Sequence, residues 1–250
     1  MLRPKALAFI GMLCAIAVTA GAALADGSSV SPTRLVFASS EVSSYLIITN
    51  TDATPQRYSV AAYEWNEADT NPIALADTND VVFFPGSFTI QGFQSQRIRV
   101  GTVSAPSSIE RTYRIVVSEL PPLGSVLGSQ TTGLAFTTSF SVPIYVTPLV
   151  PLSAGDVTGV AVDRNDLRFA IRNTGNVHFV ATAMQVTARD DSGTILSNES
   201  SSWFVLAQKQ REFTLRIPRG SCAAINSVSI HVEAGSLRFD QTVNPERSCG

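Results

Sequence analysis

The stretch that decides the fold is LAFTTSFSVPIYV, residues 134–146 of the 250-residue chain. Its even-numbered positions are Leu134, Phe136, Thr138, Phe140, Val142, Ile144 and Val146, and only Thr138 among them is polar. Because successive side chains of a strand point to opposite faces, this alternation predicts a strand with one apolar and one more polar face. The preceding loop, PPLGSVLGSQ at 121–130, has neither strand nor helix period. Such a strand is either an ordinary sandwich strand or one offered to another protein, and the run alone favours the first.

The first 25 residues have the pattern of a secretory signal peptide. Arg3 and Lys5 give a basic start, residues 6–20 are almost continuously apolar, and Ala23-Leu24-Ala25 fits a cleavage site of small residues. No later stretch approaches the length of a membrane-spanning helix. We therefore expect an exported chain that is cleaved after Ala25 and is not inserted in a membrane.

Runs with a two-residue period fill the rest of the chain, and no later segment keeps a helical period. They lie at 46–50, 58–65, 88–90, 97–100, 113–120, 157–162, 167–172, 179–188, 203–206, 213–217, 228–232 and 237–241. Short strands separated by turn residues are typical of β-sandwiches. Pro148 and Pro151 flank Leu149-Val150 and mark a hinge. The sequence thus predicts an all-β protein of two immunoglobulin-like sandwich domains, at about 26–148 and 149–250.

Two cysteines, Cys222 and Cys249, remain after the predicted signal peptide. In an exported protein an even pair is most simply a disulfide, and the alternative is two free thiols. A bond between them would close a loop of nearly thirty residues, and we expect it to contribute roughly 3–4 kcal/mol to stability.

The residue types needed for most chemistry are absent or scattered. The formal net charge is −2 and no basic block occurs, so nothing indicates a nucleic-acid partner. His178 and His231 stand alone, without a second ligand at metal-binding spacing, and no nucleophile motif is present. We therefore expect no metal, no cofactor and no enzyme activity. The acidic residues between 64 and 80 fall in a stretch that we expect to be rich in loops.

Several short pieces occur in an order that carries a family resemblance. They are SPTRLVF at 31–37, FFPGSFTI at 83–90, QRIRV at 96–100, ERTYRIVVSELP at 110–121, SFSVPIYVTP at 139–148 and LRFAIRNTGNVH at 167–178. Together they resemble the PapD-like periplasmic pilus-assembly chaperones, and within them the archaic Csu-type (spore-coat-U-like) branch. The resemblance covers nearly all of the chain after the signal peptide.

The resemblance implies two immunoglobulin-like domains in a boomerang arrangement and a periplasmic location. It also implies that the protein binds pilus subunits by donor-strand complementation, in which the chaperone lends a strand to an incomplete sandwich. The side chains that would fill the subunit's groove are Leu134, Phe136, Thr138 and Phe140, with Thr138 a departure from a fully apolar row. An outer-membrane usher is the second implied partner. Self-association of the free protein is also open, since it would hide the strand.

The resemblance also assigns roles to charged residues. Arg34 falls where the family has an arginine that grips the subunit's C-terminal carboxylate. The family's lysine of the same anchor is replaced by Pro143, and Arg97 or Arg114 could substitute for it. Arg99 and Glu110 match a structural ion pair near the domain junction. The family also has an arginine directly before the proline that ends this segment, here Pro148, and Thr147 replaces it, so that the ion-pair network has one member fewer.

Two other readings compete with the chaperone. An exported structural or adhesive sandwich protein of a pilus system would carry an alternating apolar extension at its start, whereas Asp26-Gly27-Ser28-Ser29 is short and polar. A sandwich enzyme or sugar-binding module would gather His, acidic or Trp residues on its loops, whereas Trp65 and Trp203 are isolated.

Overall fold

The structure is a computed structural model that describes residues 27–38, 41–68, 71–103, 107–121, 137–200 and 203–249. Every regular element in these ranges is a β-strand, as predicted, so none of them contains a helix that could cross a membrane. The predicted signal peptide and the predicted donor residues Leu134 and Phe136 lie outside the described residues.

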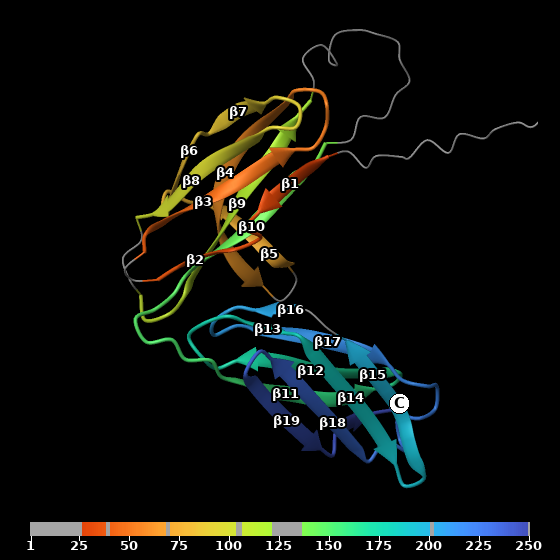
Figure 1. The fold of residues 1–250 in the computed structure, drawn as a ribbon. Coiled ribbons are helices and arrows are strands. Elements are labelled where there is room, and N and C mark those ends of the chain that lie inside the picture. Colours follow the sequence, from red (N-terminus) through yellow and green to blue (C-terminus); the bar gives the residue numbers. More distant parts are fainter. Residues whose placement is uncertain are drawn as a thin grey trace, which may run out of the picture.

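The strands up to residue 146 form two facing sheets (Figure 1). The β3 sheet has the order β1 (Ser28–Ser31), β3 (Ser43–Asn50), β8 (Ser95–Thr102) and β6 (Val81–Phe84). The β10 sheet has the order β2 (Leu35–Phe37), β10 (Ser139–Val146), β9 (Arg111–Leu120), β4 (Gln56–Ala68) and β5 (Asn71–Asp77), and β7 (Ser87–Ile90) also pairs with β4. All neighbours are antiparallel except β2 and β10, which run parallel.

Alternate residues of these strands fill the space between the two sheets. Their side chains are fully or almost fully buried, as the alternation of the sequence predicts. The core of this half includes Leu35, Phe37, Leu46, Ile48, Tyr58, Ile98, Val100, Tyr113, Ile115, Val117, Val142, Ile144 and Val146.

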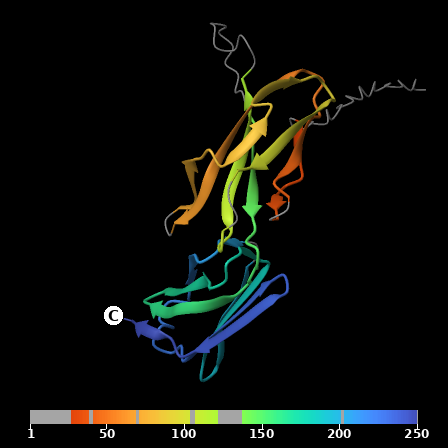
Figure 2. The same ribbon diagram turned by 90° about the vertical axis from the view of Figure 1, so that its left-hand side faces the viewer.

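The strands from Gly155 onward form the second half, which has its own core (Figures 1 and 2). One sheet has the order β17 (Gln210–Arg216), β12 (Asp166–Asn173), β11 (Gly155–Asp163) and β20 (Glu246–Ser248). The other has the order β15 (Gly193–Ser200), β14 (Ala183–Asp190), β18 (Ser227–Ala234) and β19 (Leu237–Val243). The short pair β13 (Phe179–Ala181) and β16 (Trp203–Val205) lies beside the first half. The exact domain boundary at 148/149 stays a prediction.

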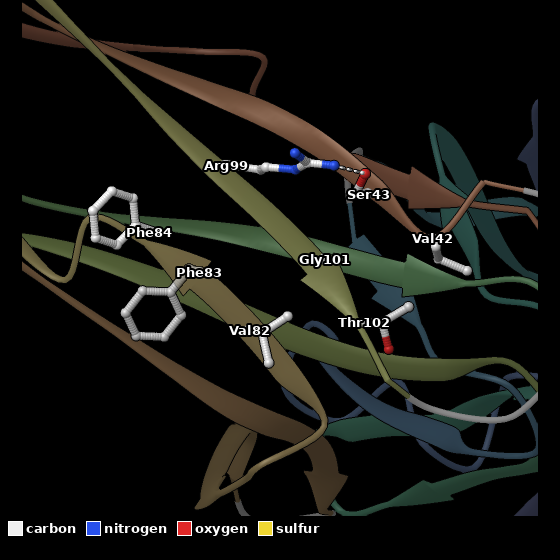
Figure 3. A pocket seen from close by; sticks show the side chains of 8 residues that line it. All are labelled: Val42, Ser43, Val82, Phe83, Phe84, Arg99, Gly101 and Thr102. Carbon is white, nitrogen blue, oxygen red and sulfur yellow. Dashed lines mark hydrogen bonds between the residues drawn. The ribbon is translucent and has the colours of Figure 1, made fainter.

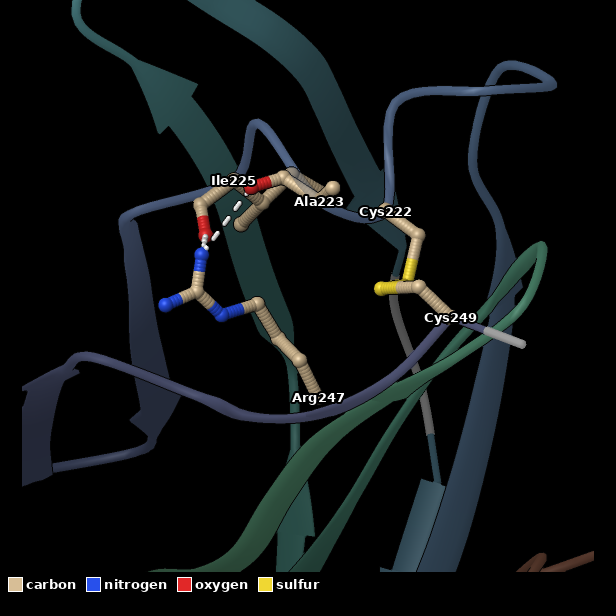
Figure 4. The surroundings of a disulfide bond; sticks show 5 residues. All are labelled: Cys222, Ala223, Ile225, Arg247 and Cys249. Carbon is tan, nitrogen blue, oxygen red and sulfur yellow. Dashed lines mark hydrogen bonds between the residues drawn. A yellow bond between two sulfur atoms is a disulfide. The ribbon is translucent and has the colours of Figure 1, made fainter.

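The predicted disulfide between Cys222 and Cys249 is present (Figure 4). The two Cα atoms are 5.7 Å apart, within the usual range for such a bond. Arg247 lies next to it and donates from Nη1 to the carbonyl oxygens of Ala223 and Ile225, at 3.0 and 3.2 Å. These contacts hold β20 against the loop that carries Cys222.

The acidic stretch between residues 64 and 80 was wrongly expected to be rich in loops. β4 continues to Ala68, and β5 pairs back onto it from Asn71 to Asp77. Alternation in β5 places Ile73 and Leu75 on an exposed face. The sequence therefore lacks the pattern of a strand with one buried apolar face, by which strands are predicted.

Candidate functional site

One side of β10 is open over most of its length. β9 pairs with all of β10 from Ser139 to Val146, whereas β2 pairs only with Ile144, Tyr145 and Val146. Among the described residues, the segment 139–143 therefore has a strand neighbour on one side only. An edge of this kind presents unpaired backbone groups and can accept a further strand.

Two hydrogen bonds show which backbone groups face the open side. The Glu119 N–H donates to the Thr138 carbonyl across β9 at 2.9 Å, and the Thr147 N–H donates to the Phe37 carbonyl on the β2 side at 2.9 Å. Since backbone groups of successive residues point to opposite sides, the odd-numbered residues face away from β9. Ser139 and Ser141 thus turn their N–H and C=O groups to the open edge. Pro143 follows, and proline is tolerated at such an edge because its missing N–H breaks no ladder bond.

The apolar face of β10 extends beyond the core of the first half. Val142, Ile144 and Val146 belong to that core, but Phe140 does not, although it lies on the same face and is half-buried. Thr138 is also half-buried and precedes the strand. Of the four predicted donor residues, the structure thus places Thr138 and Phe140 beside the open edge.

Two arginines flank Pro143 on the other face of the β10 sheet. Pro143 lies directly opposite Arg114 of β9, and Ile144 lies opposite Leu35 of β2. Arg34 precedes Leu35, so it lies at the level of Pro143 on the β2 side. The predicted anchor Arg34 is exposed, and Arg114 is the predicted substitute that the fold brings to the same row.

Arg114 is buried, with only 7% of its surface exposed. Its guanidinium lies 4.0 Å from the centroid of the Trp65 ring, and its Nη1 donates to the Ser141 Oγ at 3.2 Å and weakly to the Ser141 carbonyl at 3.4 Å. The buried Nε has no hydrogen-bond partner. Burial lowers the pKa of Arg114, because the charged form loses water.

The junction between the two halves is built on Glu110, Tyr145 and His178. The Glu110 Oε2 accepts hydrogen bonds from the His178 backbone N–H at 2.8 Å and is 2.6 Å from His178 Nδ1. The His178 ring stacks on the Tyr145 ring with centroids 3.6 Å apart and planes inclined by 8°. Trp65, Leu206 and Phe204 pack beside Tyr145. The sequence analysis gave neither His178 nor Tyr145 a role at the junction. The two residues are 33 positions apart, and no pattern in the sequence predicts that their rings stack.

The predicted ion pair between Arg99 and Glu110 was wrong. Glu110 pairs with His178, while Arg99 lies on β8 and makes a weak hydrogen bond from Nη2 to the Ser43 Oγ at 3.4 Å. Arg99 borders a groove of about 370 Å³ on the outer face of the β3 sheet, lined also by Val42, Val82 and Phe84 (Figure 3). Arg97, the other predicted substitute for the lysine, lies on this sheet too, over the Tyr45 ring. Both arginines are therefore remote from Pro143.

The described residues contain no group of three or more His, Cys, Asp or Glu side chains arranged to hold a metal ion. His231 contacts Asp240 and Glu233 on the exposed face of the sheet formed by β18 and β19.

Comparison with known proteins identifies the first half. Residues 27–150 match the family model described as the pili and flagellar-assembly chaperone, PapD N-terminal domain. No curated protein matches the chain. Among solved structures, the chain is similar to the class 5 fimbriae chaperone CfaA, with a TM-score of 0.58, 13% identity and coverage of 88% of this chain and 100% of that chain.

Two further structures have the same fold. A chain of the CsuC–CsuE chaperone–tip adhesion subunit pre-assembly complex from Acinetobacter baumannii has a TM-score of 0.59 and 14% identity, with coverage of 86% of this chain and 97% of that one. A chain of the complex of the Salmonella enterica SafA pilin with the SafB chaperone has a TM-score of 0.53 and 13% identity, with coverage of 87% and 96%. At these identities the likeness shows the two-sandwich fold of the pilus chaperones.

Proposed function

Because residues 27–150 belong to the pili and flagellar-assembly chaperone family as its PapD N-terminal domain, we propose that this protein is a periplasmic chaperone for pilus subunits. It binds a subunit by donating β10 to an incomplete sandwich and passes the subunit to an outer-membrane usher. The proposal places it in the archaic Csu-type branch, in line with its similarity to a chain of the CsuC–CsuE complex.

The observation that carries this proposal is the open edge of β10 at residues 139–143. A sandwich that lacks one strand exposes an apolar groove and a row of unpaired backbone groups, and both promote aggregation. β10 offers the complement of both, because Ser139 and Ser141 present backbone groups while Phe140 presents an apolar side chain outside the protein's own core. Leu134, Phe136 and Thr138 would extend the apolar row, and burying each large side chain would contribute about 1.5–3 kcal/mol.

Arg34 is proposed to anchor the subunit's last residue. Arg34 is exposed and directly precedes Leu35, the partner of Ile144, so it lies at the level of Pro143, where the open edge ends. A guanidinium offers paired N–H donors that match the two oxygens of a carboxylate. A subunit strand that lies along β10 would therefore end with its carboxylate at Arg34.

The decisive experiment removes one edge N–H without changing the protein's own backbone hydrogen bonds, and a control accounts for the hydroxyl that accepts from Arg114. In Ser141→Pro, the lost N–H is one that faces the open side and pairs with no other strand of the protein. Pro143 already occupies an equivalent position in β10, so the variant should fold normally. Its complex with a subunit should be about tenfold weaker, because one backbone hydrogen bond is lost and a subunit carbonyl is left unpaired. Ser141→Ala is the matched control, since it removes only the side-chain hydroxyl.

Binding would be measured by titrating purified chaperone variants with a subunit released from denaturant, and folding by circular dichroism. A Ser141→Pro variant that folds and binds the subunit as tightly as Ser141→Ala would show that β10 does not donate its edge.

A further inference from the structure

The groove on the outer face of the β3 sheet has apolar walls that are open to solvent. It lies where β6, β8 and the start of β3 meet, and its volume is about 370 Å³ (Figure 3). Phe84 is 78% exposed, Val42 57% and Val82 51%. The outer face of an antiparallel sandwich sheet is normally polar, and an exposed apolar patch is typical of a binding surface. The groove therefore suits an apolar group from outside the protein.

Gly101 forms the floor of the groove. It lies on β8, directly opposite Ser43 of β3 and Val82 of β6. An added Cβ would lie 3.5 Å from Val82 Cγ2 and 3.0 Å from the Val42 carbonyl oxygen. The backbone of Gly101 is not in the left-handed region, so its conformation does not require glycine. A glycine inside a strand often marks a place where another chain or a ligand comes close, and here it keeps the groove open.

Arg99 adds a positive charge to the rim of the groove. It is exposed and lies opposite Phe84 on one side and Tyr45 on the other. Within the ranges that the structure describes, its one hydrogen bond is the weak bond to Ser43, and it belongs to no ion pair. A guanidinium binds a carboxylate by charge-assisted hydrogen bonds, which are stronger than those between neutral groups. The rim therefore favours an anion next to the apolar group.

The groove is separate from the open edge of β10. It lies at the β6 end of the β3 sheet, whereas β1 lies at the other end and leads into β2, which borders β10. A subunit strand added to β10 would extend the β10 sheet and not the β3 sheet. A chaperone that carries a subunit would thus still present the groove to a second protein.

We propose that this groove docks a short extended segment of the usher that receives the subunit. In that segment, a leucine or phenylalanine side chain enters above Gly101, between Val42 and Val82, and a neighbouring aspartate or glutamate pairs with Arg99. A segment with basic residues at the same places is repelled. The inference rests on the proposed function, in which a second protein must recognise the loaded chaperone.

The first test uses two N-acetylated, C-amidated peptides, Gly-Asp-Phe-Asp-Gly and Gly-Lys-Phe-Lys-Gly. Each is titrated into the nitrogen-15-labelled free protein, and the amide resonance of Gly101 is followed by NMR. We expect the acidic peptide to shift this resonance and to bind at least about tenfold more tightly than the basic peptide. Arg99→Gln should reduce that preference to less than about threefold. Arg97→Gln is the matched control, because Arg97 lies on the same face of β8 over Tyr45 and does not line the groove.

The second test uses the purified complex of the protein with a subunit. We expect the acidic peptide to shift the Gly101 resonance of this complex as it does in the free protein. Binding of the complex to the periplasmic part of the usher should weaken about tenfold or more in Arg99→Gln and in Phe84→Ser. Subunit binding should stay within about twofold of wild type in both variants, since neither residue lies near β10.

Three results would overturn the inference. The first is a Gly101 resonance that does not move or that moves equally with both peptides. The second is usher binding as tight in both variants as in wild type. The third is self-association, measured by sedimentation, that Arg99→Gln abolishes, because the groove would then bind a second copy of this chain. If the wild-type protein bound no subunit, the proposed function would fail, and the peptide titration of the free protein would distinguish that failure from a failure of the groove.

Discussion

The contact of His178 with Glu110 and Tyr145 gives a prediction whose size follows from the structure. His178→Ala removes the side-chain hydrogen bond to Glu110, a carboxylate whose side chain is only 1% exposed, and also removes the ring stacked at 3.6 Å on Tyr145. A hydrogen bond to a charged group contributes about 1.5–3 kcal/mol and an aromatic pair about 0.5–1.5 kcal/mol. We therefore expect a loss of about 2–4.5 kcal/mol in the free energy of unfolding.

His178→Phe is the matched control, because it keeps a stacked ring and removes only the hydrogen bond. We expect it to cost about 1.5–3 kcal/mol, so that the difference between the two variants isolates the stacking on Tyr145. The backbone hydrogen bond from residue 178 to Glu110 remains in both variants.

The assay is urea unfolding followed by tryptophan fluorescence, since the nearly buried Trp65 lies beside Tyr145 in this junction. A Trp203→Phe background would leave Trp65 as the only emitting tryptophan. The reasoning would be refuted if His178→Ala unfolded at the wild-type urea concentration, or if His178→Phe were as destabilising as His178→Ala.

Three further results are expected. Arg34→Ala should leave the circular dichroism spectrum unchanged, because Arg34 is exposed, but should reduce recovery of the chaperone–subunit complex by about 10- to 100-fold; undiminished recovery would remove Arg34 from the site. Replacing Cys222 and Cys249 with serine should lower the free energy of unfolding by about 3.5 kcal/mol in urea titrations, from the 27-residue separation of the two cysteines; an unchanged midpoint would contradict this. Phe140→Asp should abolish subunit solubilisation on co-expression, since a charge in an apolar groove costs several kcal/mol, whereas Phe84→Asp on the β3 sheet should not. Equal effects of the two phenylalanine variants would show that β10 is not the donor strand.

The sequence was most informative where one residue pattern determines one local outcome. The alternation from Val142 to Val146 predicted a strand with a buried face, and the lone pair of cysteines predicted the disulfide. β5 was missed because its apolar residues Ile73 and Leu75 are exposed, so burial does not shape its sequence.

Contacts between distant strands were harder to predict. Arg99 and Glu110 carry opposite charges and could therefore form an ion pair. However, Arg99 lies on β8 of one sheet, whereas Glu110 directly precedes β9 of the other, and the two residues are kept apart. The sequence offered Arg97 and Arg114 equally as substitutes for a lysine at 143. Only the pairing of β9 with β10 distinguishes them, because it sets Arg114 directly across from Pro143.

The disulfide affects which strand edges of the protein are open to pairing with other chains. β20 covers the outer edge of β11 from Ala161 to Asp163, and Cys249 fastens the end of that cover to Cys222. The protein thus closes one strand edge with its own covalently tethered tail and leaves another, on β10, available. Reduction of the disulfide would free β20 to detach, and the edge of β11 from Ala161 to Asp163 would then expose unpaired backbone groups. Formation of the disulfide therefore helps to keep this edge of β11 covered, so that a foreign strand cannot pair with it.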